Sequence, residues 1–411
     1  MRKIALAAAL FFLAAPALFA KKPEIVFWHS LGFHVKELIE EMTDEYNREH
    51  PDLQVNPIFQ GLYDEMQVKM LASAVTRQLP DVAQVQVEFM QPYIVNNLIE
   101  PLVVPQEDRD DIIGGAWELV TRNGNVYGVP FCVSTEVLFY NEDAFVKAGL
   151  NPNKPPESWD DVVKYGKKLT ADTDGDGVID RYAMMFWTEG FYGLAPFLWA
   201  FDGKLLTDDG KKVVLTSKEM ASAVGLLRDL AFKYKIMPNK WTDWEAGQAF
   251  LTGKLAMGIF TSAAISYGEQ NLPWKLRIAP IPTVNGKRYS IIGGSALVNF
   301  SKNKKTKKAI NDFMLWMTNK ENTTRLHEKI GYVPVRKSAI DSLELKAFWK
   351  GNPNYKVAVD ALGYSKALPV HAEFYKINKT LKDMLQRLFL DEADQAAELE
   401  KTEQLINELI K

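Results

Sequence analysis

Strand-like and helix-like segments alternate along this chain from Glu24 onwards, and this order limits the folds open to it. Residues 25–28 are β-rich, and residues 53–59 and 82–87 predict two more strands. The apolar residues between the first two strands recur at helical spacing, namely Val35, Leu38, Ile39, Met42 and Tyr46. Because parallel strands need a crossover that a helix usually supplies, this order predicts an α/β fold with a parallel sheet.

The alternation resumes in the second part of the chain. A strand over 137–140 precedes a helix from Ser158, where the Ser158 hydroxyl and Asp161 suit a helix N-terminus. A helix over 217–234 and a strand over 255–260 follow, and two helical stretches over about 375–410 end the chain. With 411 residues and no low-complexity linker, we expect two α/β lobes between which the chain crosses more than once.

The first twenty residues are typical of a signal peptide. Arg2 and Lys3 precede an apolar run over 4–15, and small or apolar residues lead to Ala20. The run is shorter than the roughly 20 residues of a membrane-spanning helix. We therefore expect cleavage after Ala20 and a soluble periplasmic protein. Cys132 is the only cysteine, so neither an internal disulfide nor a lipid anchor is expected.

The charge balance excludes one class of partner. The chain has 49 Lys and Arg against 52 Asp and Glu, with a formal net charge of -3, so we expect no nucleic acid as a partner.

Aromatic residues are abundant, with 10 Trp, 15 Tyr and 22 Phe. Sugar rings pack their C–H faces on such side chains, while their hydroxyls need polar partners. A dense group is a candidate wall for such a cleft: Phe186, Trp187, Phe191, Tyr192 and Trp199. We expect most of these rings in the core, with Trp187 as the exception, because it lies in a Thr/Glu/Gly segment.

An acidic loop resembles the start of a calcium-binding loop. Asp172, Asp174, Asp176 and Asp180 occupy its first, third, fifth and ninth positions, with Gly177 at the sixth. The twelfth position holds Ala183 instead of the usual bidentate Glu. Two interpretations stay open, namely an acidic surface turn and a loop held by structural Ca²⁺. No other cofactor is expected.

No enzyme motif occurs in the chain, so we expect no catalytic activity. The alternative is a secreted carbohydrate-active enzyme, a glycosidase without a recognisable motif, for which Asp243 and Glu245 are candidate carboxylates. Acidic residues that flank Trp244 on a helix are more often a solvated face.

Several segments occur in the order and spacing of a known family. They are residues 25–30, 139–145 and 148–150, then Pro155, Pro156 and Trp159, and residues 253–257, 291–295 and 331–334. In these segments the chain resembles the extracellular solute-binding proteins of ABC importers, in the branch of the maltose-binding and glycerol-3-phosphate-binding proteins.

The resemblance implies a two-lobed periplasmic-binding-protein fold with a hinge and a ligand cleft between the lobes. It also implies a monomer that delivers a small polyol, glycerol-3-phosphate or sugar to the permease subunits of an ABC importer. Hinges are expected near Pro130, Ile292 and Pro334. The expected division is a signal peptide over 1–20, a first lobe over 21–128 and 295–330, and a second lobe over 129–294 and 331–411.

The resemblance further implies a set of ligand contacts. Trp187 is expected to pack on the carbon skeleton of the solute, and the backbone N–H groups of the two glycines to approach it closely. The full set is Tyr63, Glu88, Ser134, Trp187, Thr261, Ser262, Gly293, Gly294, Tyr332 and Tyr375.

Three positions depart from the pattern of the glycerol-3-phosphate binders. Val87 stands where an acidic residue is expected, with Glu88 one place along, and Gly190 replaces the second indole of a Trp pair. Tyr375 stands in place of the arginine that grips phosphate, and a phenol cannot supply its two-pronged charged contact. Unless His371 or Lys376 substitutes, the site is expected to suit an uncharged polyol or sugar.

Overall fold

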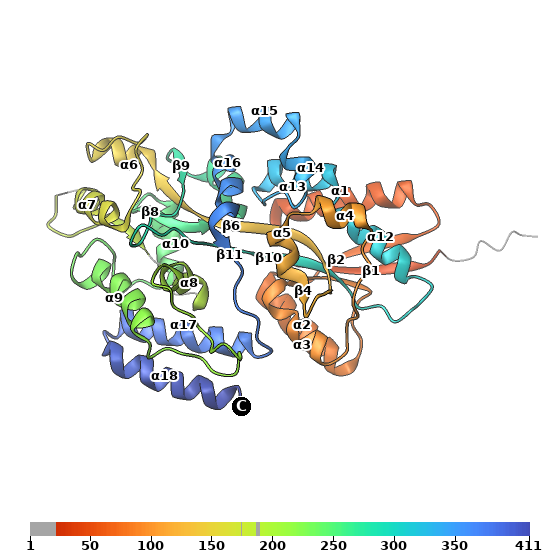
Figure 1. The fold of residues 1–411 in the computed structure, drawn as a ribbon. Helices are drawn as coiled ribbons and strands as arrows, with labels where there is room; N and C mark the ends of the chain where they lie inside the picture. Colours follow the sequence, from red (N-terminus) through yellow and green to blue (C-terminus); the bar gives the residue numbers. More distant parts are fainter. Residues whose placement is uncertain (1–21, 174, 186–189) are drawn as a thin grey trace, which may run out of the picture.

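Two long strands in the middle of the chain run through both halves of the molecule (Figure 1). The computed structural model describes residues 22–173, 175–185 and 190–411. Its strands are β1 (Glu24–His29), β2 (Gln54–Phe59), β3 (Val82–Gln86), β4 (Thr121–Arg122), β5 (Asn125–Val126), β6 (Val129–Asn141), β7 (Tyr182–Met185), β8 (Leu255–Thr261), β9 (Leu276–Ala279), β10 (Ser290–Asn299) and β11 (Ser365–Lys366).

The helices surround these strands (Figure 1). Those before β8 are α1 (Phe33–Glu49), α2 (Tyr63–Thr76), α3 (Gln91–Val95), α4 (Gln106–Asp111), α5 (Gly114–Val120), α6 (Glu142–Lys147), α7 (Trp159–Leu169), α8 (Phe191–Ala200), α9 (Lys218–Phe232) and α10 (Asp243–Leu251). Those after it are α11 (Ile265–Asn271), α12 (Lys307–Met317), α13 (Lys320–Ile330), α14 (Lys337–Ile340), α15 (Leu343–Gly351), α16 (Pro353–Asp360), α17 (Phe374–Leu390) and α18 (Gln395–Leu409). Short 3-10 turns are η1 (Val87–Phe89), η2 (Ser262–Ala264) and η3 (Ala361–Tyr364).

The main sheet mixes parallel and antiparallel pairs, so the expectation of a parallel sheet is only partly right. Its strand order is β2-β1-β3-β10-β6-β8-β7. The pairs β1–β2, β1–β3 and β7–β8 are parallel, as the helical crossovers require. The central pairs β3–β10, β10–β6 and β6–β8 are antiparallel. The sequence pattern did not reveal this, because a strand that returns from a distant segment carries no local sign of its direction.

Local sequence signals agree with the helix starts. The Ser158 hydroxyl accepts a hydrogen bond from the Asp161 backbone N–H at 3.1 Å, and the Asp161 carboxylate accepts one from the Ser158 N–H at 3.2 Å. This confirms the predicted start of α7. Thr242 and Glu245 form the same reciprocal cap on α10. The carboxylate of Glu245, a candidate for the glycosidase alternative, is therefore used to cap a helix.

The buried apolar residues form two separate clusters. One cluster takes Phe131 to Val133 from β6 and Ile292 from β10, together with residues of α1, α2, α12 and α13. The other takes Val137 to Tyr140 from β6 and Ile291 from β10, together with residues of α7 to α9, α17 and α18. β6 and β10 therefore belong to both cores, and the two bodies of Figure 1 are joined along this pair. In the described residues no helix has the length and apolar character needed to cross a membrane.

A bulge interrupts the β6–β10 pairing on the side of the first core. The register shifts between Gly294 and Ala296, and Gly294 has a φ of +124°. A Cβ added at Gly294 would lie 2.0 Å from the Cys132 carbonyl oxygen, whereas one added at Gly293 would meet only Ile291, at 3.7 Å. Glycine is therefore required at 294 but not at 293.

This contrast gives a prediction about stability. Gly294→Ala should lower the free energy of unfolding by about 2 kcal/mol, because it combines a strained backbone with a backbone clash. Gly293→Ala, the matched control, should change it by less than about 1 kcal/mol, since its Cβ fits without a clash. Urea denaturation of both variants measures the difference, and equal destabilisation would contradict the account.

Candidate functional site

A polar cluster lies at the edge of the first core, where three elements meet. Tyr63 begins α2, Gln84 lies on β3 and Ser295 lies on β10. The Gln84 amide donates to the Tyr63 hydroxyl at 3.0 Å and to Ser295 Oγ at 2.8 Å. Burial raises the pKa of Tyr63 above its usual range, so its hydroxyl stays neutral. The cluster therefore offers a fixed, uncharged hydroxyl at this point.

Glu88 lies beside this cluster, in the 3-10 turn η1 that follows β3. The turn removes Glu88 from the strand, so the one-residue offset seen in the sequence does not point it to the opposite face of the sheet. Its side chain is 5% exposed, and Oε1 accepts a hydrogen bond from the Tyr192 hydroxyl. Oε2 is buried without a partner among the described residues. Burial raises the pKa of Glu88 to about 7, although Tyr192 and Arg122 partly oppose this.

The Glu88–Tyr192 hydrogen bond lies where the two cores meet. Tyr192 lies on α8, whose neighbours Phe191 and Leu194 belong to the second core, whereas Glu88 stands between Val87 of the first core and Phe89 of the second. Arg122 donates from Nη2 to the Val87 carbonyl at 3.2 Å and from Nη1 to the Leu119 carbonyl at 3.0 Å. Its guanidinium therefore supports the turn that carries Glu88.

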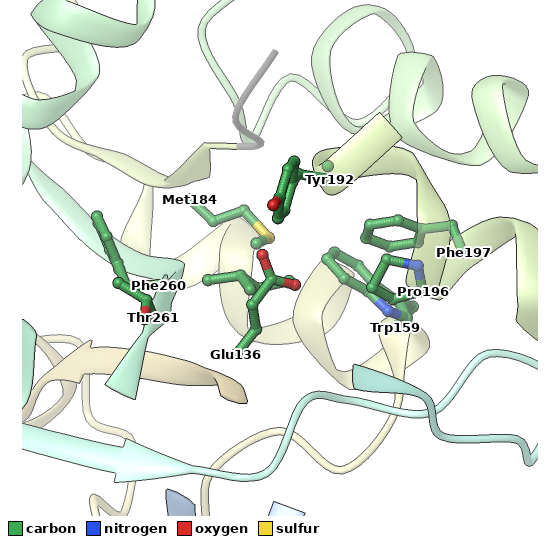
Figure 2. Close-up of a pocket in the computed structure, with 10 residues that line it drawn as sticks. Glu136, Trp159, Met184, Tyr192, Pro196, Phe197, Phe260 and Thr261 are labelled. Carbon is green, nitrogen blue, oxygen red and sulfur yellow. The ribbon is translucent and has the colours of Figure 1, made fainter. Parts of the chain in front are cut away.

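A cavity of about 250 Å³ opens on the second-lobe side of this contact (Figure 2). Its walls are mainly aromatic and apolar, and three polar side chains reach it, those of Glu136, Tyr192 and Thr261. The remaining lining residues are Trp159, Met184, Gly193, Pro196, Phe197, Ile259 and Phe260. Trp159 and Phe197 pack with their ring centroids 4.9 Å apart. Such a cavity suits a small solute with an extended apolar face.

Glu136 supplies the carboxylate of this cavity. It lies on β6, and Figure 2 shows its carboxylate pointing into the space between Trp159 and Tyr192. Burial raises its pKa to about 8, and among the described residues no charged or hydrogen-bonding group offsets this shift. The site thus contains two carboxyl groups, Glu88 and Glu136, that burial drives towards the neutral form.

Glu136 and Trp159 were not predicted as site residues. Tyr192 was predicted only as one of several rings of a candidate cleft wall, without its hydrogen bond to Glu88. A signal for Glu136 was present, because Ser134 and Glu136 are the half-buried polar residues of the otherwise buried strand β6. Residues two apart on a strand share a face, so predicting Ser134 as a contact also pointed to Glu136.

The other predicted contacts fall into two groups. Thr261 lines the cavity, and Ser134 pairs with Gly293 across β6 and β10. Ser262 is fully buried, and its Oγ accepts a hydrogen bond from the Thr135 N–H at 3.4 Å, so it faces the backbone rather than the cavity. Tyr375 is 46% exposed and packs edge-to-face on Phe89 with the centroids 5.8 Å apart. Trp187 lies outside the described residues.

Tyr332 is held by a buried histidine. His327 Nδ1 lies 2.7 Å from the Tyr332 carbonyl oxygen, and its Nε2 lies 2.8 Å from the Trp349 indole nitrogen. Because the indole only donates and the carbonyl only accepts, Nδ1 must carry the proton and Nε2 must accept. Burial lowers the pKa of His327 to about 4, which agrees with a neutral ring. The Tyr332 phenol interacts with that of Tyr63, so the predicted contacts Tyr63 and Tyr332 lie together.

The acidic loop uses its carboxylates on its own backbone. The Asp172 carboxylate accepts hydrogen bonds from the N–H groups of Gly175 and Gly177 at 2.6 and 2.8 Å. Asp180 accepts from the Thr173 N–H at 3.1 Å, and Asp176 from the Val178 N–H at 2.8 Å. Asp174 lies outside the described residues, and within those residues there is no cluster of three metal-ligating side chains. Calcium binding at this loop stays a prediction.

The sequence profile of the bacterial extracellular solute-binding proteins matches residues 41–357. The chain belongs to this family. Over 362 residues, this solute-binding protein is 26% identical to the sn-glycerol-3-phosphate-binding periplasmic protein UgpB of Escherichia coli K12, an alignment that covers 84% of this chain and 82% of the relative. The family match supports a binding protein rather than an enzyme, so the glycosidase alternative is disfavoured.

Solved structures share the fold of this solute-binding protein. UgpB from Mycobacterium tuberculosis, in complex with glycerophosphocholine, is similar with a TM-score of 0.82 at 22% identity, covering 95% of this chain and 98% of that one. The cyclic alpha-maltosyl-1,6-maltose binding protein from Arthrobacter globiformis is similar with a TM-score of 0.79 at 21% identity, covering 95% and 99%. These similarities confirm the predicted two-lobed periplasmic-binding-protein fold.

The raised pKa of Glu136 predicts how pH affects the ligand-free protein. The carboxyl has an ordinary pKa of 4.5 and a folded pKa of about 8, so between these values the folded state binds more protons than the unfolded state. The free energy of unfolding therefore falls as pH rises from about 4.5 towards and beyond 8, because the folded state must give up this proton. Glu136→Gln should raise the Tm relative to the parent protein at pH 9 and leave it nearly unchanged at pH 4.5.

Thermal unfolding across this pH range is the measurement. Glu400→Gln, on the exposed face of α18, is the matched control and should give no pH-dependent difference. A Tm difference for Glu136→Gln that is the same at every pH would show that the carboxyl titrates normally.

Proposed function

We propose that this protein captures a small polyhydroxylated solute between its two lobes and delivers it to the permease of an ABC importer. The observation that carries the proposal is the aromatic cavity beside the Glu88–Tyr192 contact. Rings supply a platform for the C–H face of a sugar or polyol, and Glu88, Glu136 and Thr261 supply partners for its hydroxyls. The relatives bind glycerol-3-phosphate, glycerophosphocholine and a cyclic maltosyl sugar, which are all solutes with several hydroxyl groups or a glycerol unit.

The composition of the site argues against phosphate as the main recognition element. Of the described residues that line the cavity, none is Lys, Arg or His. The side chains named as substitutes for the missing arginine have local partners: Lys376 forms a 2.6 Å ion pair with Glu373, and His371 Nδ1 accepts from the Glu373 N–H at 3.0 Å. The described lining residues therefore do not supply the charged contact that a phosphate needs.

Closure of the lobes is the proposed mechanism of signalling to the permease. A solute shifts the balance between open and closed forms only if it binds the closed form better, and contacts with both lobes provide this difference. The Tyr192–Glu88 hydrogen bond forms only when α8 and η1 lie together, so it stabilises the closed form relative to the open form. When the lobes open, this hydrogen bond would break, and the Tyr192 hydroxyl and the Glu88 carboxyl would become hydrated.

The proposal extends to the organisation of the mature protein. We place the change of lobe where the buried clusters change, between Val133 and Val137 on β6 and between Ile291 and Ile292 on β10. This moves the boundary that was expected at 128/129 towards the middle of β6, and the one expected at 294/295 three residues towards the start of β10. We further propose a monomer, exported to the periplasm with residues 1–20 removed.

A ligand screen with a matched pair of variants tests this function. Thermal shift and isothermal titration with maltose, trehalose, glucose, glycerol and glycerol-3-phosphate should identify an uncharged polyol that raises the Tm. Tyr192→Phe removes the hydroxyl that bonds Glu88 and should weaken binding of that polyol about tenfold, because a hydrogen bond to a charged or buried acid is worth about 1.5 to 3 kcal/mol.

The control is Tyr267→Phe, since Tyr267 lies on α11 with its side chain 48% exposed. This variant should bind as the parent protein does. Binding restricted to glycerol-3-phosphate would contradict the preference for uncharged polyols, and the absence of a Tm response to any solute would contradict the function itself.

A further inference from the structure

The polar side chains of the cavity include one acid and, among the described residues, no base. Glu136 presents a carboxylate, which in its ionised form only accepts hydrogen bonds. The Tyr192 hydroxyl already donates to Glu88, and Thr261 Oγ1 already accepts from the Ala263 N–H at 3.3 Å. Of the described side chains that line the cavity, none has an amide or a charged donor. The Thr261 hydroxyl and the Trp159 indole N–H are neutral donors, and Glu136 is the one carboxyl group among the described lining residues.

The one lining residue with an acidic side chain, Glu136, has no basic residue beside it in the described cavity wall. No Lys, Arg or His lines the cavity among the described residues, so none of these residues supplies a positive counterpart for Glu136. An ionised carboxylate that loses part of its hydration without a cation nearby is destabilised, so the partial burial of Glu136 raises its pKa to about 8.

The walls around this carboxylate are suited to a cation. The faces of Trp, Tyr and Phe attract ammonium groups, and the attraction is stronger where water is excluded. Trp159, Phe197, Phe260 and Tyr192 border the cavity from α7, α8 and β8. Figure 2 shows the Glu136 carboxylate on the side of the cavity that faces Trp159 and Tyr192. Aromatic faces and a carboxylate without a cation thus meet in one space of about 250 Å³.

We propose that the solute of this protein carries an organic ammonium group, and that this group binds in the aromatic cavity against the carboxylate of Glu136. The inference rests on the proposed function and narrows its substrate class from polyols in general to amino sugars or amino alcohols. The hydroxyl-bearing part of the solute then extends towards Glu88 and Tyr63 of the first lobe.

The cation should bind with release of a proton. Glu136 is largely protonated in the ligand-free protein near neutral pH and ionises when the ammonium group arrives. The other titratable groups near it are Tyr192 on α8 and, behind Tyr192, Glu88 on η1 and Tyr63 on α2. The facing residues of α7, β7 and β8, which are Trp159, Met184, Ile259, Phe260 and Thr261, do not titrate.

Isosteric probes separate charge from shape. Choline and 3,3-dimethylbutan-1-ol differ in one positive charge, and glucosamine differs from glucose in the same way. At pH 6.5, where glucosamine is largely protonated, we expect the cationic member of at least one pair to bind about tenfold or more tightly than its neutral partner. Ethanolamine beside choline distinguishes a primary from a quaternary ammonium group. Titration calorimetry in two buffers of different ionisation enthalpy measures the released protons.

Two variants assign the effect to the cavity. Glu136→Gln keeps the shape of the side chain and should abolish both the cation preference and the proton release, while affinity for the neutral partner changes little. Glu400→Gln, which removes an exposed carboxyl on α18, should retain both. Unchanged thermal unfolding of Glu136→Gln at pH 5 shows that a loss of preference is not a loss of the fold.

Each outcome bears on one proposal. Equal binding of cationic and neutral partners, or a cation preference that survives in Glu136→Gln, overturns the ammonium inference while leaving solute capture intact. Failure of every charged and uncharged solute to bind overturns the proposed function as well.

Discussion

The antiparallel pairing of β6 with β10 is the constraint on which the rest of this structure depends. Both strands enter both hydrophobic cores, so two bodies that would otherwise be separate share one continuous ladder of hydrogen bonds. The bulge at Gly294 lies among strand residues of the first core, and its glycine allows the Cys132 carbonyl to approach closely. Ser134, Glu136 and Gly293 lie on these strands at the junction, so the pair that joins the lobes also presents polar groups between them.

The chemistry of the junction follows from what is buried there. Glu88 and Glu136 come from different bodies, and burial rather than a neighbouring charge raises the pKa of each. Tyr192 contacts Glu88 from α8, and its phenol lies near Glu136 as well. On the opposite side, His327 fixes Tyr332 next to Tyr63. A solute held between these groups contacts both lobes, which is the condition for closure to depend on the solute.

Much of the fold could be predicted from the sequence, because its signals are local. The caps at Ser158 and Ser217 and the periodic apolar residues of α9 fixed helix positions closely. The antiparallel return of β10 could not be predicted, since pairing between segments about 150 residues apart leaves no local pattern. The site divides in the same way. The family resemblance pointed to Tyr63, Glu88 and Tyr332, which lie together. Glu136 shares a strand face with the predicted contact Ser134, whereas Trp159 became apparent only when β6, α7 and α8 were brought around one cavity.

The distance between the lobes tests the central claim most directly. Spin labels at Val75→Cys on α2 and Glu400→Cys on α18 report this distance, because Val75 is 86% exposed and the native Cys132 is fully buried. Double electron–electron resonance with a solute that binds by calorimetry should give a distance distribution that differs from the ligand-free one and is narrower. An identical distribution with and without saturating solute would contradict capture of the solute by closure of the two lobes.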